Sequence, residues 1–300
     1  MSINNLLHFE AIITQNISAS WLLDSQSRLS LLRLDLLHPV VSGNKWFKLQ
    51  FYLADAVQNN AKTIATFGGA YSNHIVATAF ACQQWGLPCV GYIRGAPQYL
   101  SHTLKDAMSY GMQLQFLSRS DYRRKNELMP EHPEYYWIPE GGYGITGAEG
   151  AATILSHATA LSSYTHIVAA TGTGTMLAGL IRGACAHQHV TGISIMKGNN
   201  ELPQLVSELL SGEEKATFHI EQDYHFGGYA KHPPQLIDYI NTCWHQYQLP
   251  LDIVYTGKAF FATEQMIRQH TIPAGSNVLF IHSGGLQGNL SLPAGTIPFS

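Results

Sequence analysis

Short apolar runs alternate with amphipathic stretches along most of the chain. Between residues 61 and 118 the apolar runs are KTIATF, PCVGYIRG and LQFLS, and the stretches between them are NHIVATAFACQQWG and HTLKDAMSYGM. The alternation returns between residues 165 and 285, with runs that include THIVAAT, VTGISIM, LDIVYT and NVLFIHSGG. Strands that alternate with helices predict βαβ units and parallel sheets. We therefore expect an α/β protein with two batches of strands and helices, separated by a helix of small residues, GGYGITGAEGAATILSHATAL.

The charge and hydropathy of the chain exclude several partners. Of the 300 residues only 12% are charged, and the formal net charge is −3, so no basic field exists to attract nucleic acid or an anionic membrane surface. No stretch approaches the roughly 20 apolar residues that span a bilayer, and the N-terminus lacks the segments of a secretory signal. We expect a cytoplasmic protein without nucleic-acid or membrane partners.

Cysteine and histidine do not indicate a metal site. No two histidines on a predicted helix have HExxH or HxxxH spacing, which argues against a metal ligand set. The cysteines have no CxxC spacing, and we expect them to be free thiols in a reducing compartment. They are Cys82, Cys89, Cys185 and Cys243.

Two lysines stand one helical turn apart in the segment SGNKWFKLQF. On a helix, Lys45 and Lys48 would lie on one face and repel each other unless an anion lies between them. The segment therefore predicts a bound anion. The bulky residues between the lysines, Trp46 and Phe47, are expected to pack in the core.

A second anion signal lies in HIVAATGTGTMLAGL, where an apolar strand runs through small residues into a helix. Unpaired N–H groups at the start of a helix, beside the positive end of its dipole, hold phosphates in many proteins. The segment is neither a Walker A loop nor a GxGxxG fingerprint. Its glycines also suit a tight turn that needs close packing. We call it the threonine-glycine loop: Gly172, Thr173, Gly174 and Thr175.

The segment ATFGGAYSNHIVATA repeats the pattern of strand, glycines and helix start, with Ser72, Asn73 and His74 at the turn. Alone, Ser or Asn at this position is an ordinary N-cap. Parallel sheets, however, bind their ligands at the carboxyl ends of the strands. We therefore expect these three residues, named the carboxylate nest, to hold a carboxylate if the threonine-glycine loop holds a phosphate.

Further polar residues follow predicted strands near the C-terminus. NVLFIHSGGLQG places His282 and Ser283 at a strand end, and LDIVYTGKAF places Tyr255 and Thr256 in the same way. A phosphate cradle without nucleotide-binding motifs, combined with Lys45 beside a Gly-Asn turn, favours pyridoxal phosphate over ATP. This cofactor requires a lysine for its Schiff base.

Six motifs in a fixed order carry a family resemblance: SGNKWFKL, GGAYSNHIVATA, PEGGYGITGAEG, ATGTGTMLAGL, VYTGKAF and IHSGG. With them the chain resembles the 1-aminocyclopropane-1-carboxylate deaminase/D-cysteine desulfhydrase family of the tryptophan synthase β-like superfamily. The resemblance implies two open, twisted parallel-sheet α/β domains with the cofactor in the cleft between them. Residues 1–50 and 156–300 would form the larger domain, which binds pyridoxal phosphate, and residues 51–155 the smaller. It also suggests a homodimer.

The resemblance assigns roles at the cofactor. Lys45 is similar to the Schiff-base lysine and Lys48 to a phosphate neighbour, while the threonine-glycine loop would hold the phosphate through its amides. Asn73 would lie beside the cofactor ring. Ser283 and Thr256 would lie close to the pyridine nitrogen.

The resemblance also assigns roles at the substrate. The carboxylate nest would surround the α-carboxylate of a small amino acid. Tyr229 and Tyr255 would face the reacting side, and Lys45 would remove the Cα proton. Ser72 is the alternative proton carrier on the opposite face, because D- and L-substrates present that hydrogen to opposite sides.

Two residues depart from the family pattern. Members that open the cyclopropane ring have glutamate at the position of Thr256; a hydroxyl there leaves the pyridine ring a weaker electron sink. Tyr71 stands where related desulfhydrases have glutamine, which changes the volume beside the carboxylate nest and hence the expected substrate.

The leading functional hypothesis is β-elimination from a small amino acid, with D-cysteine as the reference substrate. Three alternatives remain. One is a deaminase of the same fold, acting on 1-aminocyclopropane-1-carboxylate or a serine derivative. Another is a protein that binds pyridoxal phosphate or amino acids without turnover. The last is a βαβ protein for a nucleotide or sugar phosphate, in which Lys45 only contacts phosphate.

Overall fold

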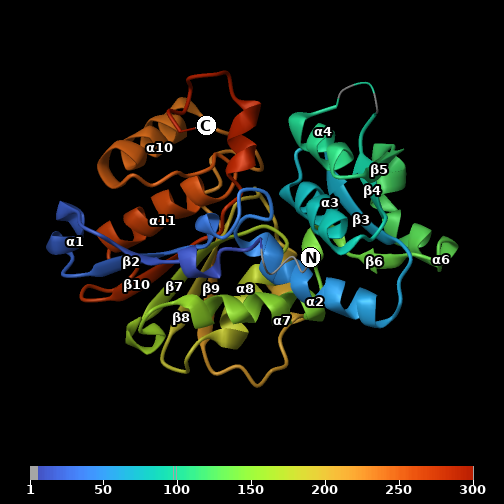
Figure 1. The fold of residues 1–300 in the computed structure, drawn as a ribbon. Helices are drawn as coiled ribbons and strands as arrows, with labels where there is room; N and C mark the ends of the chain where they lie inside the picture. The colour runs from blue at the N-terminus through green and yellow to red at the C-terminus, as the bar shows by residue number, and fades with distance from the viewer. Residues whose placement is uncertain (1–5, 97, 99, 300) are drawn as a thin grey trace.

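The larger of two sheets has six strands in the order β1-β2-β10-β7-β8-β9. The computed structural model describes residues 6–96, 98 and 100–299 (Figure 1). Strands β2, β10, β7, β8 and β9 pair in parallel, and β1 joins the edge antiparallel to β2. The strands are β1 (Thr14–Ile17), β2 (Arg28–Arg33), β7 (His166–Thr171), β8 (His189–Ser194), β9 (Thr217–Glu221) and β10 (Asn277–His282).

The smaller sheet has four parallel strands in the order β5-β4-β3-β6. All four come from the middle of the chain, so this sheet interrupts the larger one in sequence. With α3 and α4 it forms the right-hand lobe of Figure 1. The strands are β3 (Ile64–Gly69), β4 (Cys89–Arg94), β5 (Met112–Leu117) and β6 (Tyr136–Ile138).

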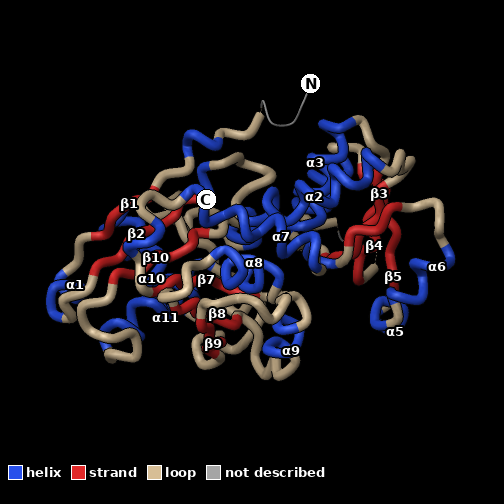
Figure 2. Tube along the Cα trace, turned by 90° about the horizontal axis from the view of Figure 1, so that it is seen from below, coloured by secondary structure: helices blue, strands red, loops and turns tan. Residues whose placement is uncertain are grey.

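Helices connect successive strands of both sheets. Figure 2 shows α2 and α7 between the two sheets. The α-helices are α1 (Ser20–Asp24), α2 (Asn44–Gln58), α3 (Asn73–Trp85), α4 (His102–Ser109), α5 (Arg119–Arg123), α6 (Leu128–Glu131), α7 (Ile145–Ala152), α8 (Thr175–Gly183), α9 (Leu202–Ser207), α10 (Pro234–Tyr247) and α11 (Thr256–Arg268).

The helix of small residues is shorter than predicted, and its composition serves packing. α7 ends at Ala152 and continues as two short 3-10 turns. A Cβ added at Gly150 would lie 2.0 Å from the Phe47 carbonyl oxygen of α2, and one at Gly179 of α8 would lie 2.5 Å from the Cβ of Ala151. The glycines and alanines therefore let α7 pack against α2 on one side and α8 on the other.

The α/β prediction with two largely parallel sheets is confirmed. The boundaries at residues 50/51 and 155/156 stay a prediction, and α2 runs without interruption through the first of them. All four cysteines are free, and three are buried. Within the described part of the chain, no helix has the length and apolar character needed to cross a membrane, and no group of three metal-binding side chains occurs.

Candidate active site

A cavity of about 380 Å³ lies where the two lobes meet. Its walls come from the start of α2, the turn before α3, the loop between β7 and α8, and the segment after β10. Eleven of the predicted site residues line it: Lys45, Lys48, Tyr71, Ser72, Asn73, His74, Gly172, Thr173, Tyr229, Tyr255 and Ser283. Residues as far apart in the sequence as Lys45 and Ser283 thus meet at one place.

The start of α2 is fixed to the end of β10 by a close backbone contact. Gly43 has φ +59°, and a Cβ there would lie only 1.8 Å from the carbonyl oxygen of Ser283. Next to it, the Asn44 amide donates a hydrogen bond of 3.1 Å to that same oxygen. Only glycine fits this approach. The contact sets the position of Lys45 relative to Ser283.

Lys45 has the environment of a reactive amine. Its Nζ donates a hydrogen bond of 2.6 Å to Oδ1 of Asn44 and lies 5.8 Å from the ring centroid of Tyr255. Burial lowers the pKa of Lys45 from 10.5 to about 8, against the opposing effect of the Asp252 carboxylate. The uncharged form, which a nucleophile requires, is therefore reached at a much lower pH than for an ordinary lysine.

Lys48 lies one turn further along α2 and is buried. Its Nζ donates a hydrogen bond of 2.6 Å to the carbonyl oxygen of Gly141. Burial, followed by the charge of Lys45, holds its pKa well below the usual value. Among the described residues, neither lysine has a carboxylate within 4.0 Å. An anion entering the cavity would thus find two amines without acidic partners.

The threonine-glycine loop forms the turn into α8. Gly174 has φ +86° and precedes the helix, and a Cβ there would lie 2.8 Å from Cγ2 of Val206. A larger residue at position 174 would therefore collide with Val206. Thr175 is fully buried behind the loop, with its Oγ1 3.1 Å from Oγ1 of Thr173. Gly172 and Thr173 line the cavity, whereas Gly174 and Thr175 lie outside its lining and could contribute backbone amides at the helix start.

The carboxylate nest forms the start of α3. Ser72 is its N-cap and accepts a hydrogen bond of 3.4 Å from the Ile75 amide, which confirms the predicted cap. Nδ2 of Asn73 donates to the carbonyl oxygen of Gly285 at 3.3 Å, and its buried Oδ1 has no partner among the described residues. The Asn73 amide oxygen is thus free for a ligand.

His74 supports the nest in a way that differs from its predicted role. The Thr66 hydroxyl donates its hydrogen to the Ile138 carbonyl oxygen, so it accepts a hydrogen bond from Nε2 of His74, 2.8 Å away. Burial, and then the charges of Lys48 and Lys45, hold the His74 pKa well below 6.5. Its Nδ1 is then an acceptor, whereas a carboxylate needs donors. His74 therefore does not fit as a direct carboxylate ligand.

Two tyrosines cover the larger-lobe side of the cavity. The rings of Tyr229 and Tyr255 are 6.2 Å apart at an interplanar angle of 78°. Burial, with the neighbouring Tyr229 phenol, raises the pKa of Tyr255 well above its usual range, and burial also raises that of Tyr229. Both phenols are consequently protonated at neutral pH and can donate hydrogen bonds.

Thr256 does not reach the cavity in which the pyridine nitrogen is expected. Thr256 is fully buried outside the cavity lining, and its hydroxyl donates to Oδ1 of Asp252 at 2.7 Å and accepts from the Asp252 amide at 2.8 Å. The predicted strand LDIVYT is wrong. In this segment the Asp252 carboxylate accepts hydrogen bonds from the backbone amides of Val254, Tyr255 and Thr256. These bonds form a turn that leads into α11.

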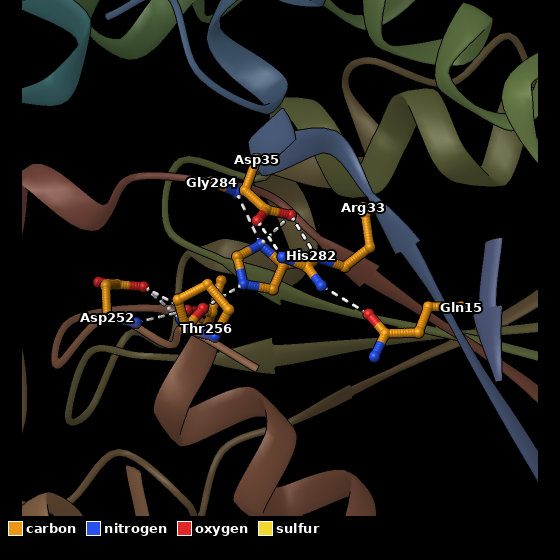
Figure 3. A network of polar contacts seen from close by, with 8 residues as sticks. Gln15, Arg33, Asp35, Asp252, Thr256, His282 and Gly284 are labelled. Atoms are coloured by element: carbon orange, nitrogen blue, oxygen red, sulfur yellow. Dashed lines mark hydrogen bonds and ion pairs between the residues drawn. The ribbon is translucent and has the colours of Figure 1, made fainter. Parts of the chain in front are cut away.

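A buried polar network surrounds His282, the residue before Ser283 (Figure 3). Nε2 of His282 donates to the carbonyl oxygen of Pro250 at 2.6 Å, and its Nδ1 lies 3.1 Å from Oδ1 of Asp35. The Asp35 carboxylate also pairs with Arg33 at 2.7 Å. His282, predicted at a strand end, thus supports the loop while Ser283 lines the cavity.

The site residues predicted from the sequence omit four polar residues of the cavity: Asn44, Arg94, Glu140 and Thr171. Asn44, the partner of Lys45, belongs to the quoted Ser-Gly-Asn turn but was assigned no role. Arg94 is the last residue of β4 and lines the cavity. The rule that placed the carboxylate nest at the end of β3 applies equally to the end of its neighbour β4, so that signal was present in the sequence.

The family model for pyridoxal-phosphate dependent enzymes matches residues 23–284. This chain belongs to that family. The predicted cofactor and family are thereby confirmed. A protein of Thermotoga maritima with the provisional name 1-aminocyclopropane-1-carboxylate deaminase is 32% identical over 276 residues, covering 85% of this chain and 87% of its own. D-cysteine desulfhydrase of Klebsiella pneumoniae is 28% identical over 271 residues, covering 82% and 83%.

Solved structures support the same family and fold. The crystal structure of an ACC deaminase homologue superimposes with a TM-score of 0.79 at 25% identity, covering 93% of this chain and 90% of that one. An aspartate racemase dependent on pyridoxal 5'-phosphate matches with a TM-score of 0.67 at 12% identity, covering 100% and 95%. The second likeness shows the shared fold alone. The chain is a member of the pyridoxal-phosphate dependent deaminases and desulfhydrases.

Proposed function

We propose that this pyridoxal-phosphate dependent enzyme catalyses β-elimination and deamination of a small amino acid, as D-cysteine desulfhydrase does. The charge of the cavity carries the proposal. Among the described residues that line it, the single carboxylate is that of Glu140, which pairs with Lys125 at 3.2 Å on the smaller lobe. Neither predicted partner of the pyridine nitrogen is a carboxylate: Ser283 lines the cavity with a hydroxyl, and Thr256 stands where ring-opening members have the glutamate that would keep this nitrogen protonated.

The residues present fit the cofactor. Lys45 offers a nucleophilic amine, and two buried oxygen atoms of the lining, Oδ1 of Asn73 and Oγ1 of Thr171, lack partners among the described residues. Lys48 and the threonine-glycine loop would hold the phosphate, Asn73 the ring and Ser283 the pyridine nitrogen. Pyridoxal phosphate, when bound, supplies an electron sink for the Cα carbanion.

The side chains of this protein handle the protons of the reaction. Lys45 removes the Cα proton from one face, with Ser72 as the alternative on the other face. The Cβ–S bond then breaks with its electron pair on sulfur, and the protonated phenol of Tyr229 or Tyr255 would donate a proton to the leaving thiolate. With one water, D-cysteine yields pyruvate, hydrogen sulfide and ammonia.

The assembly and location belong to the proposal as well. The larger domain would comprise residues 1–50 and 156–300, and the smaller residues 51–155. The enzyme would act as a cytoplasmic homodimer on a small amino acid. Tyr71, which is 54% exposed at the rim of the cavity, would set the volume beside the carboxylate nest.

A substrate panel tests the proposed reaction. Cofactor-loaded protein is assayed with D- and L-cysteine, D- and L-serine derivatives and 1-aminocyclopropane-1-carboxylate, and the keto acid is identified along with ammonia. Pyruvate from D-cysteine is the expected result. Release of 2-oxobutyrate from the cyclopropane substrate alone would identify a ring-opening deaminase. No product from any substrate would indicate a binding protein.

A further inference from the structure

Arg94 lines the cavity from the smaller lobe and has no role in the proposed reaction. It lies opposite Gly69 in the register of β3 and β4, so both residues share one face of the sheet. A Cβ added at Gly69 would lie 3.8 Å from Nη2 of Arg94, which is an ordinary contact distance, so the guanidinium lies beside Gly69. The charged group is thus held beside the turn that leads to the carboxylate nest.

The same turn connects Arg94 with the start of α3. The Ser72 amide donates a hydrogen bond of 3.1 Å to the carbonyl oxygen of Gly69, and Ser72 is the N-cap of the helix. The guanidinium and the helix start therefore lie at the two ends of one tight turn. An amino acid with its α-carboxylate at the helix start would have Arg94 within reach of its side chain.

Charge is left over at this corner of the cavity. Both Arg94 and Lys125 lie over the buried ring of Tyr122, at 5.7 Å and 5.0 Å from its centroid. Glu140 neutralises Lys125 at 3.2 Å. Within the described part of the chain, no carboxylate lies within 4.0 Å of Arg94. The ring orients a guanidinium whose charge and planar set of donors remain available.

We infer that Arg94 selects amino acids whose side chain ends in a carboxylate, and that it pairs with that second carboxylate. A guanidinium binds a carboxylate through two parallel hydrogen bonds, which gives geometric selectivity as well as attraction. The inference rests on the proposed function, because it assumes an amino acid in this cavity.

Two probes of nearly equal shape isolate the charge. S-carboxymethylcysteine carries the second carboxylate, and S-carbamoylmethylcysteine replaces it with a neutral amide. Each is supplied as the D- and L-form to the cofactor-loaded protein. Breaking the Cβ–S bond leaves the electron pair on sulfur, and with one water each probe yields pyruvate, ammonia and the free thiol. The measured quantity is the ratio of kcat/KM for acid over amide.

The wild-type protein is expected to favour the acid by about tenfold, the value of one hydrogen-bonded charge pair. Arg94→Gln should bring the ratio close to one, Arg94→Lys should retain part of it, and Arg94→Glu should invert it. The preference should also shrink as salt is raised, since Arg94 is exposed to solvent. Arg123→Gln, on the exposed side of α5, serves as the control and should keep the wild-type ratio.

Several results would overturn the inference. One is a wild-type ratio near one, and another is an unchanged ratio in Arg94→Gln. An equal loss on both probes would assign Arg94 to the α-carboxylate or to folding. If no probe yields pyruvate, calorimetric affinities of the two probes replace the rates. A retained acid preference in binding then supports the role of Arg94 while the proposed reaction fails, and equal affinities reject both.

Discussion

The ammonium of Lys258 donates a hydrogen bond of 2.7 Å to the carbonyl oxygen of Gly228, the residue before Tyr229. Lys258 is fully buried in α11, and burial lowers its pKa to about 8, opposed by the charge of Asp252. The loop that it contacts contains three successive positive φ values, +52° at Phe226, +92° at Gly227 and +119° at Gly228. A buried lysine from a helix thus anchors the irregular loop that brings Tyr229 to the cavity.

Replacing Lys258 with methionine should loosen that loop. The change keeps most of the volume but leaves a buried carbonyl oxygen without a donor, which costs about 1–3 kcal/mol. Denaturant unfolding should show this loss, and kcat should fall because Tyr229 is no longer held. Lys62→Met, at an exposed position, is the matched control. Equal stability and equal kcat in both variants would contradict the anchoring role.

Thr256→Val and Ser283→Ala should have opposite effects. Valine at 256 removes the hydroxyl that both donates to and accepts from Asp252. It should cost about 1–3 kcal/mol of unfolding free energy and leave the absorbance of the bound cofactor unchanged. Alanine at 283 should shift that absorbance with little loss of stability. A spectral shift in Thr256→Val but not in Ser283→Ala would show that Thr256, and not Ser283, contacts the cofactor.

Loading of the cofactor should depend on pH through Lys45. Below its pKa of about 8 the amine is protonated and cannot attack the aldehyde, so the rate of incorporation should rise toward pH 8 and level off above it. An ordinary lysine would show the rise near 10.5 instead. Stopped-flow absorbance of cofactor-free protein mixed with pyridoxal phosphate measures this. Lys45→Ala should show no covalent incorporation, and a flat profile would contradict the assignment.

Acid should destabilise the fold through histidines that are held neutral. Nδ1 of His38 accepts the amides of Val40 and Val41 at 3.0 and 3.1 Å, and burial lowers the pKa of His38, as it does that of His74. Below about pH 6.5 these histidines bind protons in the unfolded chain but stay neutral in the folded protein. The free energy of unfolding therefore falls as the pH falls.

Denaturant unfolding between pH 7.5 and 5 measures that loss. His38→Asn, which keeps an acceptor for the two amides without titrating, should reduce the slope. His245→Asn, on the exposed face of α10, should leave it unchanged. Stability that rises toward pH 5 would contradict the mechanism.

Gly43→Ala should be poorly tolerated. Its Cβ would meet the Ser283 carbonyl oxygen at 1.8 Å at a φ of +59°. Left-handed strain and overpacking together should cost about 3 kcal/mol or more. Gly86→Ala is the matched control, because its φ is +66° and nothing lies within 4 Å of the added Cβ; it should cost about 1–2 kcal/mol. Similar losses in both variants would show that the contact with Ser283 is not tight.

Alternation of strands and helices was sufficient to predict two parallel sheets, and the strand-end rule predicted that Ser72, Gly172 and Ser283 lie together, as they do in the cavity lining. The strand prediction failed where a side chain made the hydrogen bonds that a neighbouring strand would have made. The Asp252 carboxylate accepts hydrogen bonds from the backbone amides of the residues that follow it, so LDIVYT forms a turn instead of a strand. The Thr256 hydroxyl also donates a hydrogen bond to Asp252 and is not available to a ligand. Hydrogen bonds of this kind depend on local side-chain geometry, which apolar patterning does not report.

Other misses came from contacts between distant segments. The run of small residues around α7 predicted a longer helix, whereas in the structure these residues allow α7 to pack closely against α2 and α8. Because Nε2 of His74 donates to the Thr66 hydroxyl, Nδ1 of His74 is a hydrogen-bond acceptor, whereas a carboxylate ligand would need a donor there. Neither effect can be read from neighbouring residues, because each depends on how elements approach in three dimensions.

The joint between Gly43 and Ser283 makes the lysine and the predicted nitrogen partner one rigid unit of the larger lobe. The carboxylate nest and Arg94 belong to the other lobe. A rotation of the smaller lobe would therefore move the carboxylate nest and Arg94 relative to the substrate, while the spacing between Lys45 and Ser283 would stay constant.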